Sequence, residues 1–304
     1  MNWFWIALIT PLAHAAVNHI DKHLISKYLK GGEVGSLVLF SALFAVFALP
    51  IIAIIDHGVF SINGRDVVIL MINGGLLVLA YICYFYALAK DEASFVAPLF
   101  QMVPVLGFIL GYAILGETLT LFEIIGSLIV ICGAIILSLD LSEGAVGLKK
   151  TVILFMFGSS ALYAINGILF KFVAETQQRF WPSLFWDFLG KVAFGILIFM
   201  FIGSYRRQFI AVLKENRFSI LALSSLNEVL AIFGEGALVF ATLLAPVVLV
   251  QVVSGFQPMF VFIYGVILTL FFPSLGKESL SKKHILQKIV GVFVIMGGSI
   301  LINI

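Results

Sequence analysis

The chain has 304 residues, of which 62% are hydrophobic and 11% are charged, and its mean hydropathy is +1.16. A water-soluble protein has about a quarter of its residues charged, so this composition excludes a soluble globule and indicates a lipid-facing exterior. The formal net charge of +2 gives no indication of nucleic-acid binding. The two cysteines, Cys83 and Cys132, lie in apolar stretches and favour neither a disulfide framework nor a metal cluster.

Apolar segments of about 20 residues, the length that crosses a bilayer, follow one another along the chain. In the first half the predicted spans lie near 3–25, 36–55, 67–88, 93–115 and 121–139. After a linker at 141–150, the second half predicts spans near 151–174, 182–202, 218–241, 244–271 and 286–303. The predicted fold is therefore all-α and integral to the membrane, with ten transmembrane helices, multi-pass in the cell inner (plasma) membrane.

The N-terminal segment Met1–Val17 ends in Ala13-His14-Ala15, which mimics a signal-peptidase site. It lacks the basic start of a secretory signal, and it has a counterpart in the second half of the chain. We therefore expect this segment to form the first transmembrane helix and not to be cleaved.

Landmark residues recur in the second half in the same order. Asn18 matches Asn166 at an offset of 148 residues, and an offset of 154 relates Asn73 to Asn227, Pro104 to Pro258 and Gly111 to Gly265. An odd number of helices in each half places the two copies in opposite orientations across the membrane. Residues 1–140 and 151–304 are therefore predicted to form two inverted five-helix repeats.

One signature occurs twice and resembles the EamA-type signature of the drug/metabolite transporter superfamily. In the first half it comprises Asp91-Glu92-Ala93-Ser94 through Pro104, Gly116-Glu117-Thr118-Leu119, and Gly126 with Gly133. In the second half it comprises Gln257-Pro258, Glu278-Ser279-Leu280, and Gly291 with Gly298. The resemblance implies a secondary active transporter of a small metabolite, such as an amino acid or related polar solute, working by alternating access on a proton or solute gradient. It names no substrate, because members of the superfamily move amino acids, nucleotide sugars, drugs and other metabolites.

Two other functions are compatible with a bundle of this kind. A flippase of a lipid or lipid-linked sugar shares the architecture and would differ by a lateral opening to the bilayer. An integral-membrane enzyme or receptor would need paired catalytic groups or a soluble domain, and the sequence has no Gly-Lys-Ser phosphate loop, no His-Glu-x-x-His and no Gly-x-Ser-x-Gly. We therefore predict a protein that is not an enzyme and uses no cofactor. Its expected partners are a small-molecule substrate and membrane lipid, without nucleic acid, and a homodimer is left open.

The basic residues indicate an orientation, because cationic loops stay in the cytoplasm. Fourteen Lys and Arg side chains fall in loops 1–2, 3–4, 5–6, 7–8 and 9–10, against three on the other side, which are Arg65, Lys171 and Arg179. This bias predicts that both termini lie outside the cytoplasm, whereas the family resemblance implies that both lie inside. The charge count favours the first orientation.

Four ionisable side chains inside predicted spans are costly in a bilayer and therefore require an explanation. Asp187 and Lys191 lie four residues apart on one helix face, which predicts either a neutralising pair or an exchange of one partner for a charged substrate. Glu228 and Glu235 lie seven apart on a helix that offers no cation. They are predicted to carry protons, to attract a cationic substrate, to pair with Lys191, or to be satisfied by a neighbouring hydroxyl or amide.

Uncharged polar residues in the spans supply further candidates for substrate binding. His14 and Asn18 face one way on the first span, and Asn166 matches Asn18 on the sixth, so both pocket lining and packing between helices are open. Amides also lie beside the prolines of spans four and nine, near the midplane expected for such repeats. The remaining candidates are Gln101, Gln251, Gln257, Asn227 and Tyr84.

The signature residues themselves are predicted to be structural. Glu117 and Glu278 lie at helix junctions, and Thr118-Leu119-Thr120 is expected to cap the helix that follows. Glycines seven residues apart predict close approach between helices, and they occur at positions 126, 133, 291 and 298.

Overall fold

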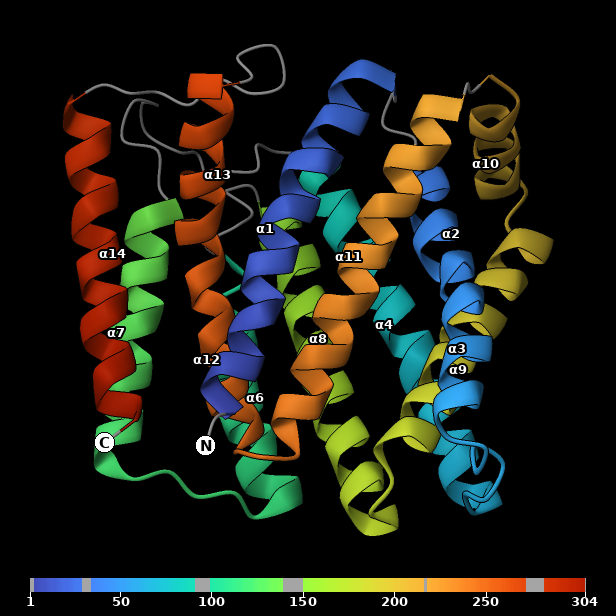
Figure 1. Ribbon diagram of the computed structural model, residues 1–304, viewed down its shortest axis with the longest axis horizontal. Coiled ribbons are helices and arrows are strands. Elements are labelled where there is room, and N and C mark those ends of the chain that lie inside the picture. The colour runs from blue at the N-terminus through green and yellow to red at the C-terminus, as the bar shows by residue number, and fades with distance from the viewer. Residues whose placement is uncertain are drawn as a thin grey trace.

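The computed structural model describes residues 3–28, 34–90, 99–138, 150–215, 218–271 and 282–303, and these residues form helices and short connections without a strand. Figure 1 shows the helices side by side, most of them running between the top and the bottom of the view. We call these two ends the upper face and the lower face. Both chain termini are marked at the lower face.

The helices follow the predicted spans closely, except at Gly203–Glu215, where a helix forms between two predicted spans. Those in the first half are α1 (Trp3–Tyr28), α2 (Val34–Phe44), η1 (Ala45–Phe47), α3 (Ala48–Ile55), α4 (Gly64–Lys90), α6 (Met102–Leu110), the π-helical turn η2 (Gly111–Leu115) and α7 (Leu121–Ser138). Those in the second half are α8 (Lys150–Gln177), α9 (Phe180–Phe201), α10 (Gly203–Glu215), α11 (Phe218–Thr242), α12 (Val247–Val253), η3 (Ser254–Phe256), α13 (Gln257–Phe271) and α14 (Lys282–Ile302).

Seven described segments are long and apolar enough to cross a membrane. They are Val34–Ile55, Gly64–Ala87, Lys150–Gln177, Phe180–Phe201, Leu221–Thr242, Val247–Phe271 and Ile285–Ile302. Two further apolar helices, Met102–Leu115 and Leu121–Leu137, are shorter, and α1 is not among the seven. The chain is thus a multi-pass membrane protein by length and composition, while the count of ten spans stays a prediction.

The outside of the bundle carries large apolar side chains. Among the most exposed are Phe60, Phe201 and Ile54, of which Ile54 is 72% exposed. Such a surface is stable against hydrocarbon and unstable against water. It agrees with the lipid-facing exterior that the composition indicates.

The strongest packing contacts join the two halves of the chain. Helix α1 packs along α11, α4 packs along α8, and α7 packs along α14. The first two contacts each join the first predicted span of one half to the third span of the other. Helix α4 also packs along α9, whereas α11 meets α2 only over a short stretch. The arrangement is therefore tight between α4 and α9 and looser between α11 and α2.

The ninth predicted span is interrupted where proline predicts it. Helix α12 ends in the short turn η3, and α13 begins at Gln257 with Pro258 in its first turn. Proline lacks a backbone N–H and clashes with the preceding turn, which breaks a regular helix. Gln251 and Gln257 therefore lie on either side of an irregular stretch of backbone.

Glycines bring α7 and α14 into backbone contact. A Cβ atom built on Gly126 would lie 2.7 Å from the carbonyl oxygen of Gly298, and one built on Gly133 would lie 3.1 Å from the carbonyl oxygen of Gly291. The predicted role of the paired glycines in close helix approach is confirmed.

Adjacent glycines in α14 provide a matched test of this contact. Gly298→Ala is expected to destabilise the protein by about 1–3 kcal/mol, because the new Cβ would meet the Gly126 carbonyl oxygen at 2.7 Å and the Val130 nitrogen at 2.8 Å. Gly297→Ala meets nothing within 4 Å, and it is expected to be neutral or to stabilise the helix by about 0.5–1 kcal/mol. Thermal unfolding of the two purified variants measures the difference. Equal melting temperatures would contradict the packing described here.

A second glycine contact, between α4 and α9, positions the polar interior. A Cβ on Gly74 would lie 2.0 Å from the backbone oxygen of Asp187, and one on Gly190 would lie 2.2 Å from the backbone oxygen of Met71. The two backbones therefore touch, which fixes Asp187 and Lys191 of α9 against the side chains of α4.

Candidate functional site

A buried ion pair lies between α9 and α11. The Lys191 ammonium is 3.0 Å from Glu235 Oε2 and 3.3 Å from Oε1, and the Lys191 side chain is 1% exposed against 13% for Glu235. Tyr81 of α4 donates its hydroxyl to Glu235 Oε1 and lies 3.2 Å from the ammonium. The ammonium also lies 5.0 Å from the centre of the Tyr81 ring. One cation thus holds a carboxylate and an aromatic ring from two other helices.

Asp187 and Lys191 do not form the neutralising pair that their spacing suggests. Asp187 Oδ1 accepts a hydrogen bond from Asn73 Nδ2 at 2.8 Å, and Asn166 Nδ2 donates to the Asn73 backbone oxygen at 3.2 Å. The cause is the contact at Gly74, which brings α4 against the short Asp187 side chain while the longer Lys191 reaches α11. The predicted alternative in which Lys191 pairs with a glutamate of α11 agrees with this geometry.

Two further carboxylates lie nearby and have neutral partners. Glu228 Oε1 accepts from Ser41 Oγ of α2 at 2.6 Å, and Asp21 Oδ1 of α1 accepts from Asn227 Nδ2 of α11 at 2.8 Å. Glu228 and Asn227 are both buried. Of the two glutamates predicted to act on this helix, Glu235 therefore has a cation and Glu228 has a hydroxyl.

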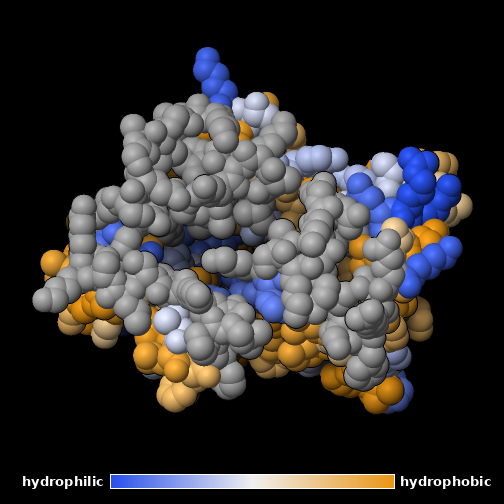
Figure 2. All heavy atoms as spheres, turned by 90° about the horizontal axis from the view of Figure 1, so that it is seen from above, coloured by the Kyte–Doolittle hydropathy of each residue, from blue (hydrophilic) through white to orange (hydrophobic). Residues whose placement is uncertain are grey.

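These charged groups lie within electrostatic range of one another. Glu228 interacts with Lys191, Asp21 and Glu235, and Tyr81 interacts with both glutamates. We call Asp21, Tyr81, Lys191, Glu228 and Glu235 the central cluster. Its members come from α1, α4, α9 and α11; in Figure 1, α1, α4 and α11 lie toward the middle of the bundle, and α9 lies to the right beside α3. Figure 2 shows hydrophilic surface near the middle of the upper face.

A row of aromatic side chains begins at Tyr81 of the central cluster. The Tyr81 ring lies 6.0 Å from Tyr163, which lies 5.9 Å from Phe100, which in turn lies 5.1 Å from Tyr84. Tyr84 interacts electrostatically with Asp21, and Tyr163 does so with Glu235. The predicted candidate Tyr84 is thus part of an aromatic row that follows the carboxylates.

The other predicted candidates lie around this centre without joining its hydrogen bonds. His14 packs against Gly234 of α11 and interacts electrostatically with Glu235 and Lys191. Gln251 packs against Gly107 and Gly167, and Gln101 faces Gly255. Asn18 and Gln257 are half-buried and make no hydrogen bond to another described residue.

Several buried amide oxygens have no hydrogen-bond partner in the described part of the chain. They include Asn73 Oδ1, Asn227 Oδ1 and Gln251 Oε1. An unsatisfied buried acceptor is costly, and such atoms in native proteins commonly mark a site for water or a ligand. The three side chains come from α4, α11 and α12.

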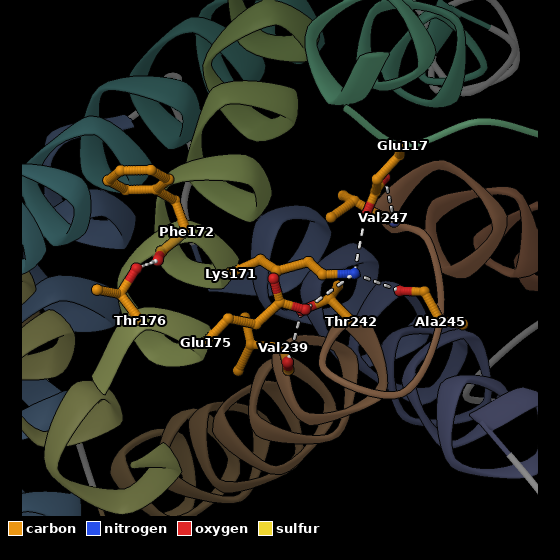
Figure 3. A network of polar contacts seen from close by, with 9 residues as sticks. All are labelled: Glu117, Lys171, Phe172, Glu175, Thr176, Val239, Thr242, Ala245 and Val247. Carbon is orange, nitrogen blue, oxygen red and sulfur yellow. Dashed lines mark hydrogen bonds and ion pairs between the residues drawn. The ribbon is translucent and has the colours of Figure 1, made fainter. Parts of the chain in front are cut away.

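A second ion pair closes the lower face, and Figure 3 shows it from close by. Lys171 Nζ of α8 lies 2.7 Å from Glu117 Oε1, 2.9 Å from the Ala245 carbonyl oxygen and 3.4 Å from Glu175 Oε1. The two Glu117 carboxylate oxygens accept from the Val247 backbone N–H at 3.1 and 2.9 Å. We call Glu117 with Lys171 the lower-face ion pair. It joins the first half of the chain to both α8 and the start of α12.

The local sequence explains how Glu117 reaches this position. Gly116 has φ +67° and ψ +19°, the left-handed conformation that favours glycine and ends the turn η2. Thr120 then accepts from the Glu123 N–H at 3.3 Å, while Glu123 Oε2 accepts from the Thr120 N–H at 2.7 Å, which is a capping box at the start of α7. The predicted helix cap is confirmed at Thr120. Glu278 lies outside the described residues.

Sequence reasoning missed several partners. Lys171 was expected at a span end and is instead buried, and Ser41 gave no signal because single serines are common in membrane helices. Tyr81 had one signal, because it lies at the repeat offset of 154 from Glu235. The structure brings these two repeat-related side chains into direct contact.

The described residues contain no group of three or more His, Cys, Asp or Glu side chains placed to hold a metal ion. The carboxylates of the central cluster are instead separated by amides, a lysine and aromatic rings. This arrangement is suited to reversible binding of an organic solute through charge and hydrogen bonds.

Comparison with known proteins gives three findings. Residues 1–139 match the model of the EamA-like transporter family, which belongs to the drug/metabolite transporter superfamily, and this confirms the resemblance stated from the signature. An uncharacterized protein of Methanocaldococcus jannaschii is 39% identical over 70 residues, which are 23% of this chain and 51% of that protein. The match thus spans about half the length of that relative. A solved crystal structure shares the fold at a TM-score of 0.62 and 15% identity, over 98% of this chain and 94% of its own.

Proposed function

We propose that this chain, whose residues 1–139 belong to the EamA-like transporter family, is a secondary carrier that moves a small solute across the membrane by alternating access. The family match supports a membrane transporter, and the solute-binding site is our own assignment. We place that site at the central cluster, between helices contributed by both halves of the chain.

One observation carries the proposal. Ionisable side chains of α1, α9 and α11 converge inside a bundle whose outside is apolar, and two of their carboxylates, Asp21 and Glu228, have neutral hydrogen-bond partners among the described residues. Charge buried at membrane depth is expensive and is retained where it serves a solute or ion pathway. A purely structural bundle would be more stable with apolar side chains at these positions.

The contacts at the lower face support one half of a transport cycle. Three contacts at this face join elements of both halves. They are the lower-face ion pair, the hydrogen bond from Trp186 Nε1 to the Val59 oxygen at 2.8 Å, and the hydrogen bond from an Arg179 N–H to the Gly58 oxygen at 3.4 Å. Figure 2 shows hydrophilic surface near the middle of the upper face. We assign the structure to a state that is closed at the lower face, with opening of the lower contacts as the other half of the cycle.

No phosphate-binding loop is present in the sequence, so the energy for uphill transport comes from a proton or solute gradient. The negative charge of Glu235 is neutralised by Lys191. Glu228 is therefore the carboxylate of α11 that can bind a solute or a proton. The orientation in which basic loops face the cytoplasm places the upper face inside the cell.

Counterflow in liposomes tests the proposal. Purified protein is reconstituted into liposomes loaded with a mixture of unlabelled amino acids and amines, and each labelled solute is then added outside in trace amounts. A carrier makes the matching labelled solute accumulate transiently above its equilibrium level, whereas empty liposomes do not. Scrambling of labelled lipid without solute counterflow would favour the flippase and contradict the carrier.

A charge-removing variant locates the site in the same assay. Glu228→Gln keeps an acceptor for Ser41 and removes the charge, and we expect counterflow to fall by about tenfold or more, which corresponds to about 1.4 kcal/mol. The matched control is Glu123→Gln, where the amide still accepts from the Thr120 N–H at the α7 cap. Equal activity of the two variants would place the solute site elsewhere.

A further inference from the structure

Asp21 and Glu228 differ from the other buried carboxylates in their surroundings. Glu235 lies against Lys191 and Glu117 lies against Lys171, each within 3.0 Å. Asp21 and Glu228 make no ion pair with a described residue, and their closest partners are an amide and a hydroxyl. They interact electrostatically with each other, so their negative charges face a common region.

An orphaned acceptor borders the same region. Asn227 is 5% exposed, its Nδ2 donates to Asp21, and its Oδ1 has no hydrogen-bond partner. Asn227 precedes Glu228 in α11 and holds Asp21 of α1, so the amide and the two carboxylates lie at the same level of the bundle. Three acceptors therefore lie at one level of the bundle, and Lys191, which interacts with Glu228, is already paired with Glu235. An unsatisfied buried acceptor is costly. A ligand that carries positive charge and N–H or polarised C–H groups would satisfy them.

The aromatic row supplies the second recognition element. Tyr84, Phe100 and Tyr163 follow one another with ring centres 5.1 and 5.9 Å apart, and Tyr84 interacts electrostatically with Asp21. Aromatic faces attract cations within about 6 Å of the ring centre, most strongly where water is excluded. The Lys191 ammonium over the Tyr81 ring, at the end of this row, is an internal example.

We propose that the central cluster binds an organic cation, an alkylammonium group joined to an apolar or aromatic body. The ammonium lies between Asp21 and Glu228 beside Asn227, and the body lies along Tyr84, Phe100 and Tyr163. This rests on the proposed function and names the substrate class of the same site. An inorganic divalent ion fits less well, because the described residues offer no group of three metal-binding side chains.

Calorimetric binding to the purified full chain tests the charge requirement with three probes that share a phenyl ring. Trimethyl(2-phenylethyl)ammonium is a permanent cation, phenylalanine is a zwitterion and 3-phenylpropanoate is an anion. We expect saturable binding of the cation and none of the anion. Asp21→Asn and Glu228→Gln are each expected to weaken cation binding by about tenfold or more. Asp66→Asn, at a carboxylate held by Gln177 at the lower face, is the matched control and is expected to leave binding unchanged.

A measurement on the unaltered chain covers the case in which the variants fold poorly. Dicyclohexylcarbodiimide reacts with carboxyl groups in apolar surroundings, and mass spectrometry locates the modified residues. We expect the trimethylammonium probe to slow modification of Asp21 and Glu228 and to leave Glu117 unaffected. Absence of cation binding, equal binding by the two variants and the wild type, or absence of protection would each overturn the inference.

The outcomes separate this inference from the proposed function. If phenylalanine shows counterflow and the cation does not bind, the carrier stands and the cation site fails. If the cation binds with the expected variant pattern and neither it nor any amino acid or amine crosses the liposome membrane, the site stands and the transport function fails.

Discussion

Glu235→Gln is expected to lower the free energy of unfolding by about 3–5 kcal/mol, because it leaves Lys191 buried without its counter-ion. Lys191 is 1% exposed and its ammonium makes its ion pair with Glu235 alone among the described residues, so water cannot replace the lost carboxylate. The Tyr81 hydroxyl stays within reach but carries no charge. The variant should therefore give a much lower melting temperature and a low yield of monodisperse protein.

The double variant Lys191→Met with Glu235→Gln distinguishes charge from packing. It removes both charges and keeps an acceptor for Tyr81, and buried pairs replaced in this way commonly retain their stability. We expect most of the lost stability to return. Thermal unfolding of wild type, both single variants and the double variant completes the cycle. A single variant as stable as the wild type would show that the ion pair does not form.

Lys171→Met is the second change with a large expected effect, also about 3–5 kcal/mol. It removes the ammonium that joins Glu117 to the Ala245 carbonyl, and it leaves the Glu117 carboxylate, 10% exposed, with only the Val247 N–H. Thermal unfolding measures this loss. Because the lower-face ion pair joins the two halves, counterflow should change in the same variant.

Glu117→Gln is the matched comparison for that change. The amide still accepts from the Val247 N–H, and Lys171 keeps Glu175 at 3.4 Å, so the expected cost is only about 1–2 kcal/mol. If Glu117→Gln were the more damaging of the two variants, the buried ammonium would not be the group that needs compensation, and the account of this contact would be wrong.

Much of the fold follows from the sequence because hydropathy is a strong signal over about 20 residues. The helices match the predicted spans to within a few residues over most of the described chain, and the glycines at 126 and 133 predict the contact of α7 with α14. The count of ten spans stays a prediction, because α6 with η2 is short and α1 ends in polar residues. Whether the short helix and the polar helix end lie inside the bilayer depends on how neighbouring helices shield them from lipid.

The site could be predicted only as a set of polar residues. Charge in an apolar span singles out Asp187, Lys191, Glu228 and Glu235, since the cost of insertion makes such residues rare. Spacing along one helix then suggests the pair of Asp187 with Lys191, and this is where the prediction is wrong. Partners on different helices depend on rotation and close approach, here on the contact at Gly74, and one sequence does not contain that information.

The internal repeat indicated more of the contacts in the site than residue spacing along single helices did. The offset of 154 residues relates Tyr81 to Glu235, and these two side chains touch in the structure. It also relates Asn73 to Asn227, each of which holds an aspartate of another helix. The organisation into two inverted repeats stays a prediction, which these paired contacts support.

Water access to the central cluster is the most direct test of the whole account. A single cysteine is placed at Ser41, the partner of Glu228, in a chain with Cys83→Ala and Cys132→Ala, and a membrane-impermeant thiosulfonate is added to vesicles of either orientation. A cysteine at the lipid-facing Ile54 is the control. The account predicts that position 41 reacts from one side, that Ile54→Cys does not, and that a transported solute slows the reaction. A cysteine at position 41 as unreactive as the one at position 54, from both sides, would show a dry and structural interior.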